Sequence, residues 1–146
     1  MVSVEMLAPA AVLVLWSLVM LLWMVATRFT AFGQMKVDLG RPESRGGRGR
    51  DLEGRLPERV MWKAHNHDHL MEQPTIFYPT VIVLALTGPA ALDIGLAWAY
   101  VVLRIAHSFW QSLVNTIPVR LAIFTLATLC LIVLAVRALL ATLGAA

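Results

Sequence analysis

The sequence predicts an all-α integral membrane protein, a bundle of four transmembrane helices in one domain spanning residues 1–146. Three observations carry this prediction. Of the 146 residues, 59% are hydrophobic and only 14% are charged, whereas soluble domains carry about 25% charged residues. The apolar residues also form four blocks rather than an amphipathic pattern. Each block reaches or approaches the roughly 20 helical residues needed to cross a bilayer core of about 30 Å.

The blocks place the helices at about residues 6–32, 58–88, 92–116 and 118–143, with a loop at about 33–57. Met6–Thr27 and Gln73–Leu92 carry no charge, Ile94–Val119 is interrupted only by Arg104, and Leu121–Ala146 only by Arg137. The first block lacks the basic segment that precedes the apolar core of a signal peptide. We therefore interpret it as a retained helix.

Basic residues are concentrated between the first two helices, whereas the hairpin after the second has none. The basic set is Lys36, Arg41, Arg45, Arg48, Arg50, Arg55, Arg59 and Lys63. The positive-inside rule therefore predicts a cytoplasmic loop, with both termini on the opposite side. The loop also contains five acidic residues (Asp38, Glu43, Asp51, Glu53 and Glu58), which argues against a nucleic-acid partner. Its centre, residues 42–54, is rich in Gly and charge and is predicted to be flexible.

Polar residues near the start of the second helix are predicted to share one face. His65, His69 and Glu72 are spaced i, i+4, i+7, and Asn66 lies at the edge of this stripe. Counting along the helix places Glu72 near the cytoplasmic boundary of the membrane. The sequence has only four histidines and lacks the further His-rich boxes of membrane di-iron enzymes, so we expect no metal site.

The third helix carries a second polar stripe, Arg104, His107, Gln111 and Asn115. Arg104 is expected close to mid-membrane, where a charged residue costs about 2.5–3.5 kcal/mol on insertion scales. It should face the bundle interior, and Glu72 is the carboxylate at a suitable depth. The alternatives are a purely structural Arg104–Glu72 pair, a stripe of interhelical hydrogen bonds, and interface-anchor roles for Arg120 and Arg137.

Two segments, AHNHDHLMEQPTIFYP and YVVLRIAHSFWQSLVNTIPVR, resemble the MAPEG superfamily, the membrane-associated proteins of eicosanoid and glutathione metabolism. The resemblance implies a homotrimer that holds glutathione between subunits. It implies that Glu72 and Arg104 bind the tripeptide, that His107 occupies a neighbouring polar position, and that Arg120 stabilises the thiolate. A guanidinium group favours S⁻ over SH, and the thiolate is the nucleophile. The second substrate would be a lipophilic electrophile entering from the bilayer.

The sequence departs from the eicosanoid-type members at three positions. Gln111 stands where those members carry Tyr, and Leu121 where some carry a hydroxyl residue. Their Asn-x-x-Glu motif corresponds either to His69 and Glu72 or, with a small insertion, to Asn66, so both remain binding candidates. These departures favour a general glutathione-dependent transferase or peroxidase over a prostaglandin or leukotriene synthase. The alternative is a non-catalytic lipid-binding or interaction subunit with the same fold.

Overall fold

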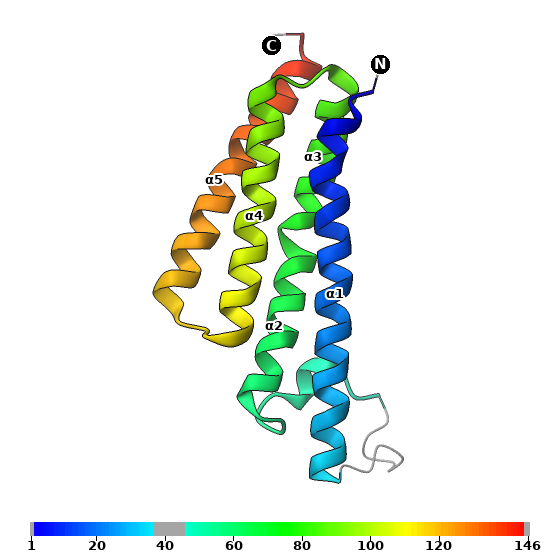
Figure 1. Ribbon diagram of the computed structural model, residues 1–146, viewed down its shortest axis with the longest axis vertical. Coiled ribbons are helices and arrows are strands. Elements are labelled where there is room, and N and C mark those ends of the chain that lie inside the picture. The colour runs from blue at the N-terminus through cyan, green and yellow to red at the C-terminus, as the bar shows by residue number, and fades with distance from the viewer. Residues whose placement is uncertain (1, 37–45, 145–146) are drawn as a thin grey trace.

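The computed structural model describes residues 2–36 and 46–144, and its helices are arranged as one elongated bundle (Figure 1). Arg41, Arg45, Asp38 and Glu43 of the predicted basic loop lie outside the described residues. The helical elements are α1 (Val4–Met35), a short 3-10 helix (Gly49–Leu52), α2 (Glu58–Glu72), α3 (Pro74–Thr87), α4 (Ala91–Leu113) and α5 (Ile117–Thr142). Both termini lie at one end of the bundle, opposite the connection between α1 and α2.

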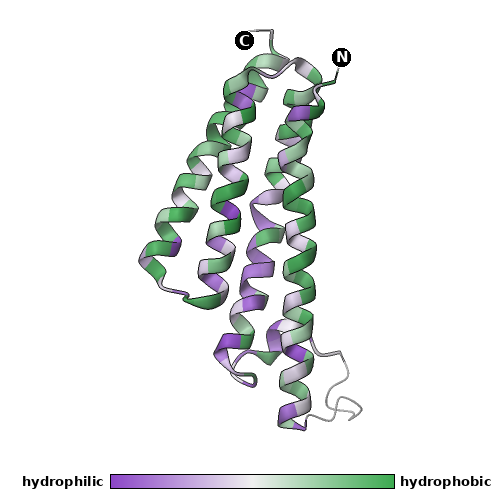
Figure 2. Ribbon diagram, viewed as in Figure 1, coloured by the Kyte–Doolittle hydropathy of each residue, from purple (hydrophilic) through white to green (hydrophobic). Residues whose placement is uncertain are grey.

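Four helical segments of the described chain are long and apolar enough to span a membrane: α1, α2 with α3, α4, and α5. This confirms the predicted all-α membrane fold. Large apolar side chains cover the outside of the helices, for example Leu15 and Leu22 of α1 and Leu121 of α5. Figure 2 shows the same pattern, with green apolar ribbon along α1 and α5 and polar residues gathered in α2. The exposed apolar surface is therefore the surface that contacts lipid.

The second span is interrupted at Gln73, between α2 and α3. We predicted one helix over residues 58–88, and the structure has one candidate membrane span over Glu58–Thr87 with a break at Gln73, where Pro74 begins α3. Proline has no amide proton and its ring clashes with the carbonyl of the preceding turn. The break falls between the polar first half of this span, which carries His65, His67 and His69, and its apolar second half.

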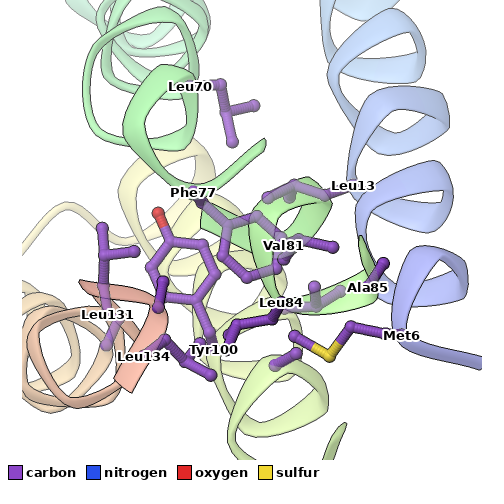
Figure 3. Packing of buried hydrophobic residues seen from close by; sticks show 14 of the residues in the cluster. Met6, Leu13, Leu70, Phe77, Val81, Leu84, Ala85, Tyr100, Leu131 and Leu134 are labelled. Atoms are coloured by element: carbon purple, nitrogen blue, oxygen red, sulfur yellow. The ribbon is translucent and has the colours of Figure 1, made fainter. Parts of the chain in front are cut away.

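The apolar core joins all four spans, with Leu70 contributed by α2 beside residues of α1, α3, α4 and α5 (Figure 3). Phe77 of α3 stacks on Tyr100 of α4, with ring centroids 4.3 Å apart. Met6 and Leu13 from α1 and Leu134 from α5 are fully buried around them. Buried aromatic pairs of this kind add about 0.5–1.5 kcal/mol to the effect of area burial.

The terminal end of the bundle is closed by an ion pair between α4 and α5. Arg137 donates from Nε and Nη2 to the two carboxylate oxygens of Asp93. Oδ2 of Asp93 also accepts from the backbone N–H of Ala90, which caps the start of α4. We expected Arg137 to be an interface anchor, but its guanidinium has this bidentate partner. The hydropathy pattern did not reveal this ion pair, because Asp93 was read as a polar residue of the turn between the second and third helices.

The other end is organised by the described part of the connection between α1 and α2. A small apolar cluster contains Met24, Ala31, Leu56, Met61 and Ala64. Nε2 of His65 lies 2.8 Å from Oε2 of Glu53. These contacts hold the start of α2 against α1.

Candidate functional site

A cavity of about 180 Å³ opens between α2, α4 and α5 at the end of the bundle away from the termini. Its lining consists of His69 from α2, His107 from α4, and Ile117, Arg120, Leu121 and Phe124 from α5. Three of the residues singled out in the sequence therefore meet here: His69, His107 and Arg120. The cavity combines two imidazoles and a guanidinium group with an apolar wall.

The two histidines of the cavity face one another edge to face. The ring centroids of His69 and His107 are 5.9 Å apart, with an interplanar angle of 71°. Phe124 lies beside both rings, at 6.4 Å from His69 and 6.1 Å from His107. Nδ1 of His69 is 3.3 Å from Oε2 of Glu72, one turn further along α2. Glu72 itself does not line the cavity, and its side chain is 67% exposed.

Arg104 lies behind the cavity and is 1% exposed. Its Nη2 donates to the backbone carbonyl of His69 at 2.6 Å, and its guanidinium carbon lies 5.8 Å from the centre of the Phe124 ring. Its Nε and Nη1 are buried without a hydrogen-bond partner among the described residues. Arg104 faces the bundle interior as expected, but no carboxylate of the described chain is within ion-pair distance. The predicted direct pair with Glu72 is absent, because the Glu72 side chain is exposed and contacts His69 instead.

Arg120 is held by the turn between α4 and α5. Its Nη1 donates to Oδ1 of Asn115 at 2.5 Å. Asn115 has φ of 60°, a left-handed conformation that Asn tolerates better than most residues. Nε1 of Trp110 donates to Oγ1 of Thr116 at 2.9 Å and braces the same turn. The guanidinium group is therefore anchored from one side, while the cavity lies on the other.

Asn115 does not extend the polar stripe of the third helix as we predicted. The expected helix continued to residue 116, whereas α4 ends at Leu113 and Asn115 reverses the chain. Its role as the acceptor for Arg120 was missed in the sequence. An Asn shortly before a proline at the start of the next helix was the available signal, since Asn favours left-handed turn positions.

The two remaining candidates, Asn66 and Gln111, are buried but do not line the cavity. Nδ2 of Asn66 donates to Oγ of Ser108 at 2.6 Å, joining α2 to α4. Oε1 of Gln111 is buried without a partner in the described chain. Of the two residues that could correspond to the Asn of the Asn-x-x-Glu motif, His69 lines the cavity and Asn66 packs between helices.

A further polar network lies next to the cavity at the α2–α3 interruption. Gln73 donates from Nε2 to Oγ1 of Thr128 at 2.8 Å, and its Oε1 accepts from the hydroxyl of Tyr100 at 3.3 Å. No motif or spacing in the sequence had indicated a role for Gln73, Tyr100 or Thr128. Their hydrogen bonds tie α4 and α5 to the interruption and fix the wall of the cavity.

The chemistry available in the cavity is that of anion binding and proton transfer. Among residues 2–36 and 46–144, no group of three His, Cys, Asp or Glu residues is arranged to hold a metal ion. Two guanidinium groups approach from α4 and α5, and one of them has two buried donors still to satisfy. A ligand with carboxylate or thiolate groups would satisfy such donors, because charge-assisted hydrogen bonds are the strongest of their kind.

Comparison with known proteins gives one result. A family model described as the MAPEG family matches residues 6–140 of the chain. The match includes part or all of each of the four candidate spans in the described residues, and all of the cavity residues. No curated protein and no solved structure gives a significant match.

Proposed function

The chain belongs to the MAPEG family, and we propose that it is a glutathione-dependent transferase or peroxidase that acts on lipophilic electrophiles. The observation that carries the proposal is the cavity, in which Arg120 and two histidines meet an apolar wall at the end of a membrane bundle. Family membership makes this a membrane protein related to those of glutathione and eicosanoid metabolism.

The charges around the cavity match those of glutathione. The tripeptide carries two carboxylates and one ammonium group, and the site offers Arg104 as a cation and Glu72 as an anion. Nε and Nη1 of Arg104 have no partner in the described chain, so a bound carboxylate would supply one. Glu72 is exposed one turn from the cavity residue His69 and would accept from the ammonium group. His107, Gln111 and Asn66 would complete the polar surroundings of the peptide.

Arg120 would stabilise the thiolate of bound glutathione. It lines the cavity and is only half-buried, so its guanidinium can meet a ligand while Asn115 holds it. A positive charge in a site of low dielectric favours the ionised sulfur. In the transferase reaction the sulfur forms a bond to an electrophilic carbon, and the leaving group departs with its electron pair. In the peroxidase reaction the sulfur attacks a peroxide oxygen, the O–O bond breaks, and the other oxygen leaves with its electron pair and a proton as the alcohol. A second glutathione then reduces the resulting sulfenic acid to give the disulfide and water.

The second substrate would reach the sulfur from the lipid side. Ile117 and Leu121 line the cavity and are also exposed on the outer face of α5. This apolar rim is continuous with the surface that contacts lipid, so a hydrophobic compound could enter laterally. The lack of a phenol at Gln111 is the reason for proposing general electrophiles rather than a prostaglandin or leukotriene precursor.

We also propose the assembly and the orientation that the family implies. In a homotrimer, a neighbouring subunit would complete a cavity that is open in the single chain. Arg48, Arg50, Arg55, Arg59 and Lys63 are concentrated at the same end as the cavity. The positive-inside rule would then put this end in the cytoplasm, where glutathione is abundant.

The decisive experiment is glutathione binding by the purified full chain in lipid nanodiscs, followed by calorimetry and by thermal unfolding. We expect saturable binding at millimolar glutathione and a higher melting temperature, because a ligand that binds only the folded state stabilises it. Turnover would be measured with a halogenated nitroaromatic electrophile and with an organic hydroperoxide. No binding and no turnover would reject the proposal and leave the non-catalytic alternative.

Arg120→Ala separates binding from chemistry. We expect glutathione affinity to change little and kcat to fall about 10²–10³-fold, the usual effect of removing one donor that stabilises a reacting anion. Arg59→Ala is the matched control, because Arg59 is exposed at the start of α2 and does not line the cavity. Normal turnover by Arg120→Ala would show that the thiolate is stabilised by another residue.

A further inference from the structure

His69 and Glu72 contact each other, and the binding roles proposed above do not account for this contact. They stand one helical turn apart on α2, with Nδ1 of His69 3.3 Å from Oε2 of Glu72. The imidazole lines the cavity, and its Nδ1 is buried without a hydrogen-bond partner in the described chain, so the contact with Glu72 is one at ion-pair distance. A neutral imidazole that carries its proton on Nδ1, toward the carboxylate, presents a basic Nε2 to the cavity.

The other histidines lack this combination. His107 lines the same cavity, but no carboxylate of the described chain lies within ion-pair distance of it. His65 contacts Glu53 at the loop, away from the cavity. His67 lines a separate apolar groove beside α1. Among the described residues, His69 alone therefore has both access to the cavity and a carboxylate within ion-pair distance.

Arg120 by itself cannot activate a thiol. A guanidinium group stabilises the thiolate once it has formed, but it has no lone pair with which to accept the proton. Weak nucleophiles in enzymes are activated by a neighbouring base, and that base is commonly oriented by a third group. The cavity supplies a cation and a histidine–carboxylate pair, which together fulfil these two requirements.

We infer that His69 is the general base that deprotonates the glutathione thiol, and that Glu72 orients it; this rests on the proposed function. The S–H bond breaks and the proton passes to Nε2 of His69, leaving the electron pair on sulfur beside Arg120. The sulfur then forms its bond to the electrophile. The imidazolium returns its proton to the leaving group or to water, so His69 is neutral for the next cycle. Oε1 of Glu72 stays available to the ammonium group of the tripeptide.

This assignment predicts a characteristic dependence of kcat/KM on pH. Activity should be lost as pH falls, when His69 becomes protonated and can no longer accept the proton. The charged and titratable groups around His69 are Glu72 and Asp68 on α2, Arg104 and His107 on α4, and Arg120 on α5. The pH profiles of the His69 variants are therefore measured with these five residues kept as in the wild type.

The test is His69→Gln in the full chain, with His67→Gln as the matched control on the opposite groove of the same helix. We expect His69→Gln to bind glutathione with nearly unchanged affinity and to lower kcat about 10²–10³-fold near neutral pH. The near-ultraviolet absorbance of the bound thiolate should appear only at higher pH, and the rate should recover there. Glu72→Gln should shift the same profile by a smaller amount, whereas His67→Gln should match the wild type.

The outcomes are distinguishable. If wild type binds and turns over glutathione but His69→Gln keeps its rate, pH profile and thiolate absorbance, the base assignment is wrong and the proposed function stands. If His107→Gln gives the loss instead, the base is His107. If wild type neither binds nor turns over glutathione, both proposals are rejected. Thermal unfolding of each variant identifies any loss of activity that is caused by misfolding. A variant whose rate recovers at high pH must be folded.

Discussion

The two ends of the bundle differ in the partners that they provide for an arginine of a membrane-spanning helix. At the terminal end, Arg137 of α5 donates twice to Asp93 of α4, and the carboxylate is itself buried and fixed by the cap of α4. At the cavity end, Arg104 is more deeply buried, yet one backbone carbonyl is its only hydrogen-bond partner in the described chain. Arg120 beside it has an amide acceptor and no acid within ion-pair distance among the described residues.

This difference separates a structural site from a functional one. A buried charge is expensive unless it is paired and hydrogen-bonded. The Asp93–Arg137 pair meets that condition within the chain. It links α4 to α5, and its bonded donors and acceptors already have partners. Arg104 does not meet that condition within the described chain, where two of its buried donors have no partner; in the proposed function these are the donors that a bound carboxylate would satisfy. Natural proteins commonly sacrifice stability at a binding site in this way.

The largest effect on stability should come from breaking the satisfied pair. Asp93→Ala removes both the partner of Arg137 and the cap of α4, and we expect the free energy of unfolding to fall by about 2–3 kcal/mol. Unfolding in mild detergent, followed by circular dichroism, measures the change. Glutathione affinity should be unaffected, since Asp93 lies at the other end of the bundle. A stability equal to wild type would show that the pair contributes nothing to the fold.

The opposite change in stability is expected at the cavity end. Arg104→Met removes a buried charge that lacks a carboxylate and keeps much of the side-chain volume, so the free energy of unfolding should rise by about 1 kcal/mol. Glutathione binding should be lost in the same variant. Arg137→Met is the control and should lower the melting temperature. If Arg104→Met destabilised the protein as Arg137→Met does, the contrast between the two ends would be wrong.

A smaller effect should come from loosening Arg120 without removing it. Asn115→Gly tolerates the left-handed backbone at φ of 60° and loses only the acceptor for the guanidinium. We expect kcat to fall about tenfold, equivalent to about 1.4 kcal/mol, with glutathione affinity unchanged. Asn115→Asp keeps an acceptor oxygen and should retain more activity. Equal rates for Asn115→Gly and wild type would mean that Arg120 is positioned by the ligand alone.

The smallest effect is expected at the loop beside the cavity. His65 and Glu53 are 2.8 Å apart, but their side chains are 41% and 60% exposed. Exposed pairs contribute about 0.2–1 kcal/mol or less and are screened by salt. Glu53→Gln should therefore change the unfolding free energy by less than about 1 kcal/mol, and this difference should vanish in high salt. A larger, salt-resistant change would indicate that the loop is part of the site.

Sequence periodicity predicted which residues of the site share a helix face, but it did not predict their partners. His69 and Glu72 were placed on one face because they lie within one turn, and their contact follows directly from helical geometry. Arg104 was expected to meet Glu72 because both lay at roughly compatible depths. Depth along a membrane normal says nothing about rotation around the bundle, and the Glu72 side chain is exposed rather than turned toward Arg104. Asn115 was misplaced because a single left-handed residue is not visible in hydropathy.

The sequence by itself determined the membrane-spanning fold, since four apolar blocks of sufficient length have no other stable arrangement in a bilayer. Its motifs also determined the family, and they selected His69, His107 and Arg120 as candidates. Only the tertiary structure decided that these three line one cavity, that Arg137 has a carboxylate partner whereas Arg104 does not, and that Asn115 anchors Arg120. Each of these depends on which faces of different helices meet. That choice is made by packing across the bundle, which the pattern within one helix does not encode.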